Sequence, residues 1–287
     1  MKLIRKGKVK DIFETSDNTL IFSFSDRVSA YDVILHDEIP YKGKVLCDFA
    51  IFWFKTLKGK NHFRRRVDTN KIEVTKLHMI PIECVVRSYL YGSLYSRYLK
   101  HNVKIPGTER YFLNGHLPLA SKLPELIFDP TTKSYQHDMP LSEPEILNNK
   151  IVSRTELSEL KKLSLDLFSQ VDSMVSRSGF ILSDIKFEFG KEPTTGEIIL
   201  ADSIGPDEFR IWNKDDYKVG HIQDSYDKQI LRDWLESIGF REEVEKCNNN
   251  NTFPDIPKLP PAIIEKVSQR YIDAYERITR STFSKNS

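Results

Sequence analysis

The alternation of apolar and polar positions predicts a strand-rich first part of the chain. Its predicted strands are rich in β-branched and aromatic residues, and Ser16-Asp17-Asn18 is typical of the turn in a hairpin. Apolar side chains recur at helical spacing in residues 44–58, so a helix is expected there, ended by Gly59. The predicted strands are residues 8–13, 20–24, 63–67, 72–75 and 81–89.

The second part is predicted to combine loops, long helices and one more hairpin. Residues 102–150 carry many turn-favouring prolines and glycines and are expected to be loops. Ser153 and Glu156 form a capping-box pattern before an apolar stripe, so a long helix should run from there to Ser178-Gly179. The remaining predictions are strands at 180–189 and 197–202, helices at 225–239 and 261–279, and a polar linker at 248–251.

The length of the chain predicts two lobes. The first lobe, mainly antiparallel, is expected to close near Leu77. The chain then divides into residues 1–77 and residues 78–287.

Composition and charge narrow the class of protein. The 43 Lys and Arg against 41 Asp and Glu give a net charge of +2, which argues against a nucleic-acid-binding protein. The cysteines at 47, 84 and 247 have no metal-ligand spacing, which favours a reducing compartment. The N-terminus lacks a signal-type apolar region, and the densest apolar run, Phe49 to Phe54, is far shorter than the ~20 residues that span a bilayer. We expect a soluble, cytoplasmic protein that binds neither nucleic acid nor membranes.

The predicted strand at 180–189 carries the most informative charges. Because side chains alternate across a strand, Asp184, Lys186 and Glu188 share one face. A solvated face would look the same. The partner strand ends in Asp202, which hairpin pairing can bring beside Asp184 or Glu188, and two carboxylates with a lysine suit Mg²⁺ and phosphate oxygens.

Two further segments could bind anions. Gly7-Lys8-Val9-Lys10-Asp11 combines a glycine with lysines but lacks the phosphate-loop spacing, and alone it favours a basic, solvent-facing strand. Arg87 lies within an apolar strand and needs an anionic partner if buried, either a ligand or a carboxylate of the fold. Gly92-Ser93 follows at a predicted helix start, which is a natural phosphate site.

The turn after the second hairpin also carries unexplained charges. Residues 201–212 hold three carboxylates and Arg210 among apolar residues. His137-Asp138 could orient a ligand or be an ordinary loop feature. Arg64-Arg65-Arg66 is expected to be a solvated face, with nucleic-acid binding as the less favoured alternative.

Over nearly its whole length the sequence resembles the phosphoribosylaminoimidazole-succinocarboxamide synthase (SAICAR synthetase) family. The two most specific motifs are Pro81-Ile82-Glu83-Cys84-Val85-Val86-Arg87, leading to Gly92-Ser93, and Asp184-Ile185-Lys186-Phe187-Glu188-Phe189-Gly190. Supporting segments are Gly7-Lys8-Val9-Lys10-Asp11, Ser25-Asp26-Arg27-Val28-Ser29-Ala30-Tyr31-Asp32 and Ile39-Pro40-Tyr41-Lys42-Gly43.

The resemblance implies a fold and a reaction. The expected fold has a small, kinase-like antiparallel β lobe over a larger ATP-grasp-like α+β lobe, with the nucleotide between them. The expected enzyme is an ATP-dependent ligase of purine biosynthesis that uses Mg²⁺. It joins L-aspartate to carboxyaminoimidazole ribonucleotide through an acyl phosphate, giving SAICAR, ADP and phosphate. A small-molecule kinase and a non-catalytic nucleotide-binding sensor are the alternatives, and the oligomeric state stays open.

The resemblance also assigns roles to residues. It implies catalytic roles for Lys186 and Asp184 and metal ligation by Glu188 and Asp202. The chain departs from the family pattern at Ser183, usually aliphatic, at Ser203, often Glu, and at Glu208-Phe209, usually small residues. The implied ATP site is Gly7, Lys8, Lys10, Asp11 and Glu83, and the implied substrate site is Arg87, Ser93, Asp207 and Arg210.

Overall fold

The computed structural model describes the whole chain except residues 17, 102–104, 106–116, 134–138, 251 and 286–287. His137-Asp138, a candidate ligand-orienting pair, therefore lies outside the described residues. Within the described residues no helix is long and apolar enough to cross a membrane.

A five-stranded antiparallel sheet forms from the first quarter of the chain. Its order is β1-β2-β3-β7-β6, and β3 is its buried centre, because Ile21, Phe22 and Phe24 face the core. A separate pair, β4 and β5, follows β3. These strands are β1 (Lys2–Lys6), β2 (Lys10–Ser16), β3 (Thr19–Phe24), β4 (Arg27–Ala30), β5 (Val33–Glu38), β6 (Phe63–Asp68) and β7 (Lys71–Thr75).

A six-stranded sheet forms the centre of the molecule. Strand β11 lies between β8 on one side and β12 and β13 on the other, all antiparallel, while β9 and β10 pair with β8. Its strands are β8 (His78–Tyr89), β9 (Lys122–Phe128), β10 (Thr131–Thr132), β11 (Phe180–Lys191), β12 (Ile198–Ala201) and β13 (Phe209–Asn213).

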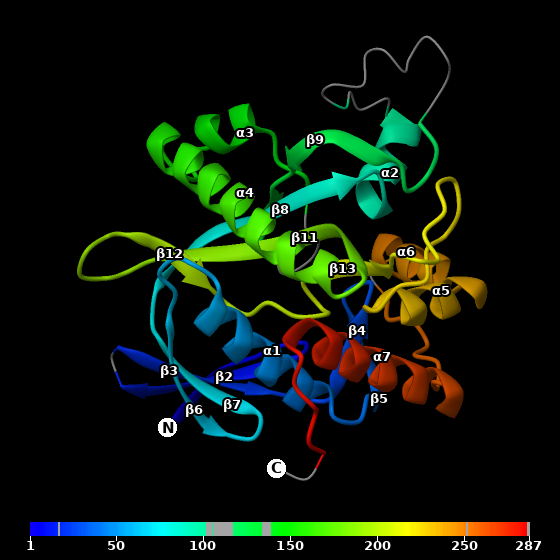
Figure 1. Cartoon of the computed structure of the whole chain (residues 1–287), viewed down its shortest axis with the longest axis horizontal. Helices are drawn as coiled ribbons and strands as arrows, with labels where there is room; N and C mark the ends of the chain where they lie inside the picture. Colours follow the sequence, from blue (N-terminus) through cyan, green and yellow to red (C-terminus); the bar gives the residue numbers. More distant parts are fainter. Residues whose placement is uncertain (17, 102–104, 106–116, 134–138, 251, 286–287) are drawn as a thin grey trace.

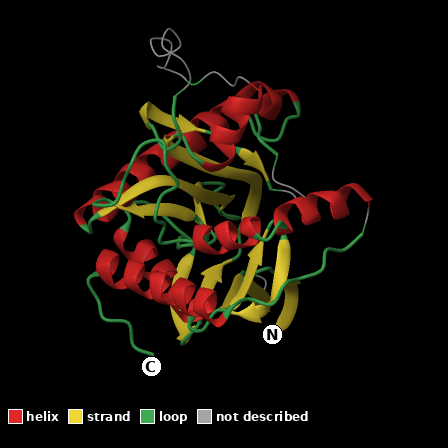
Figure 2. Cartoon of the chain, turned by 90° about the vertical axis from the view of Figure 1, so that its right-hand side faces the viewer, coloured by secondary structure: helices red, strands yellow, loops and turns green. Residues whose placement is uncertain are grey.

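Helices cover both sheets. Helix α4 lies across β8 and β11, and α1 packs against the first sheet and α7 (Figure 1). In the view turned by 90°, helices lie on several sides of the strands (Figure 2). The helices are α1 (Lys42–Thr56), α2 (Gly92–His101), α3 (Glu143–Asn148), α4 (Arg154–Arg177), α5 (Gln229–Ser237), α6 (Phe240–Asn250) and α7 (Pro261–Thr279).

The mixed α and β composition with antiparallel sheets is confirmed. The predicted capping box is also confirmed, since Ser153 Oγ accepts from the Glu156 N–H at 3.2 Å. Two local predictions need correction. Residues 102–150 are not all loop: β9, β10 and α3 lie there. The predicted linker at 248–251 is wrong for its described residues, because α6 extends to Asn250.

Candidate functional site

A charged face of the central sheet forms the middle of the candidate site. On β11, Ile185, Phe187 and Phe189 are buried in the core, and the alternation turns Asp184, Lys186 and Glu188 to the other face. A fully solvated face is excluded, because the Glu188 side chain is only 8% exposed.

The neighbouring strand brings a second carboxylate to this face. Glu83 on β8 lies directly opposite Glu188 on β11, a like-charge pair that would be unfavourable alone. The Lys186 ammonium donates to Glu83 at 2.8 Å, and Lys133 pairs with Glu188. Burial alone would lower the pKa of Lys186, but the two glutamates more than offset this and raise it. Burial would raise the pKa of Glu188, yet Lys133 and Lys186 lower it. Lys186 and Glu188 therefore both favour their charged forms.

The register decides which carboxylate Asp202 approaches. Glu188 is the partner of Ala201, the last residue of β12, so Asp202 follows directly beyond Glu188. Asp202 has a left-handed backbone with φ of 59°, and its carbonyl oxygen accepts from Nε2 of buried His62 at 3.0 Å. Of the two pairings open to the sequence, Asp202 next to Glu188 is the one present.

This carboxylate pair fits a magnesium ion. Among the described residues no group of three or more His, Cys, Asp or Glu converges as a metal site. Mg²⁺ commonly uses one or two protein carboxylates, with phosphate oxygens and water completing its shell. Glu188 and Asp202 supply that number of oxygen ligands.

The first sheet contributes one lysine to this pair. Lys10 of β2 forms an ion pair with Asp202 and donates to Ser203 Oγ at 3.1 Å. Burial lowers the pKa of Lys10 to about 8. The other members of this predicted segment are engaged elsewhere: Lys8 pairs with Asp32, and Asp11 accepts from Arg27 at 2.6 Å.

Gly7 closes the same segment as a tight turn. Its N–H donates to the Lys10 carbonyl oxygen at 2.9 Å. A Cβ added at Gly7 would collide with that oxygen, so the turn requires glycine. This turn holds Lys10 at the start of β2.

Arginines gather at the other end of the charged face. Arg87 donates to Asp129 at 2.6 Å and to Ser93 Oγ at 3.0 Å. Arg210 donates to Asp184 at 2.9 Å and packs against Gly92, whose φ is +56°. Three of the predicted residues, Arg87, Ser93 and Arg210, are thus brought together.

A third arginine, which sequence reasoning missed, joins this cluster. Arg97 of α2 pairs with Asp129, and its buried Nε has no hydrogen-bond partner among the described residues. With Arg87 and Arg210, three guanidinium groups face two carboxylates, Asp129 and Asp184, which leaves a formal charge of 3 − 2 = +1. The sequence did contain a signal for Arg97: it lies four residues after Ser93 and therefore on the same face of α2.

Asp207 is not part of the arginine cluster. It is buried, accepts from Lys42 at 2.7 Å and from the Tyr271 hydroxyl at 2.8 Å, and lies 3.5 Å from Lys228. Burial would raise the pKa of Asp207, but Lys228 and Lys42 lower it well below its usual range. Lys42 lies in a segment that carried the family resemblance, whereas Lys228, Tyr271 and Lys133 had no distinguishing pattern.

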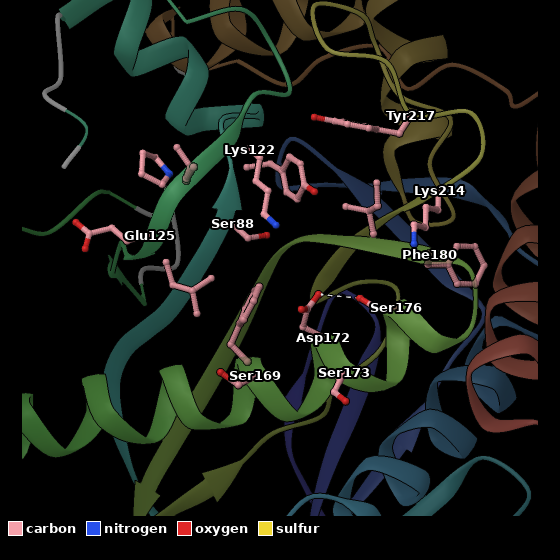
Figure 3. Close-up of a pocket in the computed structure, with 16 residues that line it drawn as sticks. Ser88, Lys122, Glu125, Ser169, Asp172, Ser173, Ser176, Phe180, Lys214 and Tyr217 are labelled. Carbon is pink, nitrogen blue, oxygen red and sulfur yellow. Dashed lines mark hydrogen bonds between the residues drawn. The ribbon is translucent and has the colours of Figure 1, made fainter. Parts of the chain in front are cut away.

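A cavity of about 760 Å³ lies on the opposite side of the central sheet (Figure 3). It is lined by Asp172 and Ser176 of α4, Lys122 of β9, and Ser88, which follows Arg87 on β8 and so faces the other way. None of the predicted site residues lines it. The converging charges, and not this volume, mark the candidate active site.

Comparisons with known proteins point to one family. The SAICAR synthetase family model matches residues 3–247. A phosphoribosylaminoimidazole-succinocarboxamide synthase from Nitrosopumilus maritimus is 46% identical, over 97% of this chain and 98% of its own length. The synthase of the same name from Saccharomyces cerevisiae is 35% identical, over 99% of this chain and 96% of its own.

Solved structures show the same arrangement of elements. SAICAR synthase from Saccharomyces cerevisiae in complex with SAICAR superposes with a TM-score of 0.81 at 34% identity, covering 98% of this chain and 96% of that one. A SAICAR synthetase in complex with ADP gives a TM-score of 0.73 at 26% identity, covering 98% of this chain and 99% of that one. With a family match along most of its length and the two specific motifs facing each other across β8 and β11, this chain belongs to the SAICAR synthetase family.

Proposed function

We propose that this protein is the ATP-dependent ligase that joins L-aspartate to carboxyaminoimidazole ribonucleotide, giving SAICAR, ADP and phosphate. The observation that carries the proposal is the single charged face, where the lysine and carboxylate pairs of β11 adjoin the cluster of three arginines. Relatives of the same fold bind SAICAR and ADP. We expect the enzyme to act in the cytoplasm.

In this proposal ATP lies between the two lobes, residues 1–77 and 78–287, arranged as in kinase-like and ATP-grasp enzymes. Lys10 would neutralise phosphate oxygens, with Gly7, Lys8 and Asp11 lining the nucleotide and Glu83 orienting Lys186. Glu188 and Asp202 would hold Mg²⁺, which when bound would neutralise phosphate charge. Both carboxylates pair with lysines, so exchanging a lysine for a bound cation keeps the local charge balanced.

The arginine cluster would bind the 5′-phosphate of the ribonucleotide. A guanidinium group can grip phosphate with two parallel hydrogen bonds, and Ser93 adds a hydroxyl at the start of α2. Asp184 orients Arg210 and could accept from ribose hydroxyls. Asp207 would contribute to the substrate site indirectly, by accepting a hydrogen bond from Lys42 and so positioning that lysine.

The reaction follows in two steps. The substrate carboxylate attacks the γ-phosphorus of ATP, forming an acyl phosphate and releasing ADP, while Lys186 and Lys10 stabilise the charge on the transferred group. The aspartate amine then attacks the acyl carbon, the carbon–nitrogen bond forms, and phosphate leaves.

An ADP-release assay with each substrate omitted in turn tests this function. We expect continuous ADP release only when the ribonucleotide, aspartate and ATP are all present, together with SAICAR formation. Continuous release without aspartate would instead identify a small-molecule kinase, and ATP binding without turnover would identify a sensor.

A further inference from the structure

Glu208 lies in the turn between β12 and β13, against the centre of the charged face. Its N–H donates to the Gly205 carbonyl oxygen at 2.9 Å, which closes the turn. Its own carbonyl oxygen accepts from the Lys186 N–H at 2.9 Å. These two bonds fix the backbone of Glu208 beside Lys186 on β11.

The Glu208 carboxylate is set apart from the other acids of the site. Glu83, Glu188, Asp202 and Asp207 each pair with a lysine. In the described part of the chain, no hydrogen bond or ion pair uses the partly buried Glu208 side chain. Its carboxylate is therefore available to a ligand.

The charges around Glu208 come from several elements. Lys10 of β2, Lys186 of β11 and Lys42 of α1 attract its negative charge, whereas the adjoining Asp207 repels it. The negative charge of Glu208 also raises the pKa of Lys228, beside α5, and of Tyr271 on α7. Burial, and after it Asp207, raises the pKa of Glu208 to about 7, against the pull of Lys10 and Lys186. A carboxyl group with this pKa can accept and release a proton near neutral pH.

We propose that Glu208 is the base that takes a proton from the ammonium group of the amino-acid substrate. The proposal rests on the function proposed above. The amine must reach the acyl carbon, which is joined to the transferred phosphoryl group through a single oxygen atom. If Lys10 and Lys186 hold that group, Glu208 lies next to it, because its backbone is bonded to that of Lys186.

The proton balance of the step is complete. The substrate ammonium gives one proton to the Glu208 carboxylate and becomes a neutral amine, whose lone pair forms the bond to the acyl carbon. The bond between that carbon and the phosphate oxygen breaks, and the departing phosphate takes the second amine proton. Glu208 then releases its proton to water. The amide, monohydrogen phosphate and a reset carboxylate result.

A second observation supports a role for this residue. Ser203, where the family pattern often has Glu, lies against Lys10 with its hydroxyl 3.1 Å from the ammonium nitrogen. The negative charge of Glu208 is one of those that raise the pKa of Lys10, against the lowering by burial. The Glu208 carboxylate therefore adds to those of Asp202 and Glu188 in the surroundings of Lys10.

The test compares aspartate with hydroxylamine as the nucleophile in the Glu208→Gln enzyme. Hydroxylamine is uncharged at neutral pH and traps an acyl phosphate as a hydroxamate without needing a base. We expect kcat with aspartate to fall by about 100-fold or more at pH 7, in the range of general-base effects, while hydroxamate formation stays within a few-fold of the unaltered enzyme. Raising the pH should restore much of the aspartate rate, because free amine becomes abundant.

Matched variants complete the design. Glu208→Asp should recover part of the aspartate rate, and Glu265→Gln, the same change at an exposed position of α7, should alter neither rate. Equal loss with both nucleophiles, or an unchanged aspartate rate, would overturn the role of Glu208. Absence of hydroxamate with the unaltered enzyme would instead count against the acyl phosphate of the proposed function.

Discussion

Strands β6 and β11 both carry several charged residues, and these charges lie in opposite environments. β6 reads Phe-Arg-Arg-Arg-Val-Asp and is exposed over nearly its whole length. β11 alternates charged and apolar residues, and it is largely buried. Arg65 on β6 is 65% exposed and pairs with Glu73 on the surface, whereas Glu188 on β11 is 8% exposed and pairs within the candidate site.

The position of each strand in its sheet explains the difference. β6 is an edge strand with one neighbour, β7, and its side chains are left largely exposed to water. β11 has neighbours on both sides, and the first sheet sends Lys10 onto its charged face. A strand with several charged residues can form a functional site when other elements pack over its charged face and bring oppositely charged partners to it.

The largest effect is expected from Glu188→Gln. Gln keeps the shape but removes the charge that would bind Mg²⁺ on the buried strand, so turnover should fall by orders of magnitude, of the size seen when one electrostatic group is lost. Thermal unfolding should still show a cooperative transition. Near-normal turnover at saturating Mg²⁺ would remove Glu188 from the metal site.

Arg87→Ala tests the other end of the same face. Loss of a charge-assisted bond of about 1.5–3 kcal/mol should raise KM for the ribonucleotide roughly tenfold or more, with smaller changes for ATP and aspartate. Arg87→Lys should recover only part, because the planar fork is lost. A rise in KM for aspartate alone would place this arginine in the amino-acid pocket.

Lys10 and Lys8 provide a comparison within one segment. Lys10 is buried beside Asp202, whereas Lys8 is 43% exposed and pairs with Asp32. Lys10→Met should weaken ATP binding by about tenfold, and Lys8→Met by less, since exposed pairs contribute little. Calorimetric titration with ATP measures both, and equal losses would show that burial does not separate the two lysines.

His62 gives a prediction for stability instead of activity. Burial lowers the pKa of its imidazole from 6.5 to about 3. Between these values the unfolded chain binds a proton that the folded protein does not, so stability falls as the pH drops below 6.5, by about 1.4 kcal/mol per pH unit. The free energy of unfolding can be measured with urea at pH 7.5 and at pH 5.5. Its decrease between these two pH values should be smaller in His62→Gln than in the unaltered protein. An identical loss in both proteins would exclude His62 as the cause.

The smallest effect is expected from Arg65→Ala on the edge strand. Its side chain is 65% exposed to water, so the free energy of unfolding should change by no more than about 0.5 kcal/mol. SAICAR formation should be unchanged. A large loss of activity would mean that β6 belongs to the site and that the contrast with β11 fails.

Local signals in the sequence were sufficient for several elements. The capping box at Ser153 and Glu156 predicted the start of α4, and Pro261 begins α7 as its fixed φ favours. The alternation in residues 180–189 predicted the charged face of β11. These features depend on neighbours a few residues apart, which is why the sequence alone determined them.

The tertiary structure decided the rest. The sequence left two partners open for Asp202, and only the pairing of Glu188 with Ala201 selected one. Strands β9 and β10 went unrecognised because both gain their hydrogen bonds from β8, which lies far from them in sequence, and β10 is only two residues long. Asn248–250 ends up helical because α6 is anchored earlier by buried Phe240 and Val244. The Lys10–Asp202 pair joins residues 192 positions apart, a contact that no local pattern encodes and that forms only when the two sheets pack together.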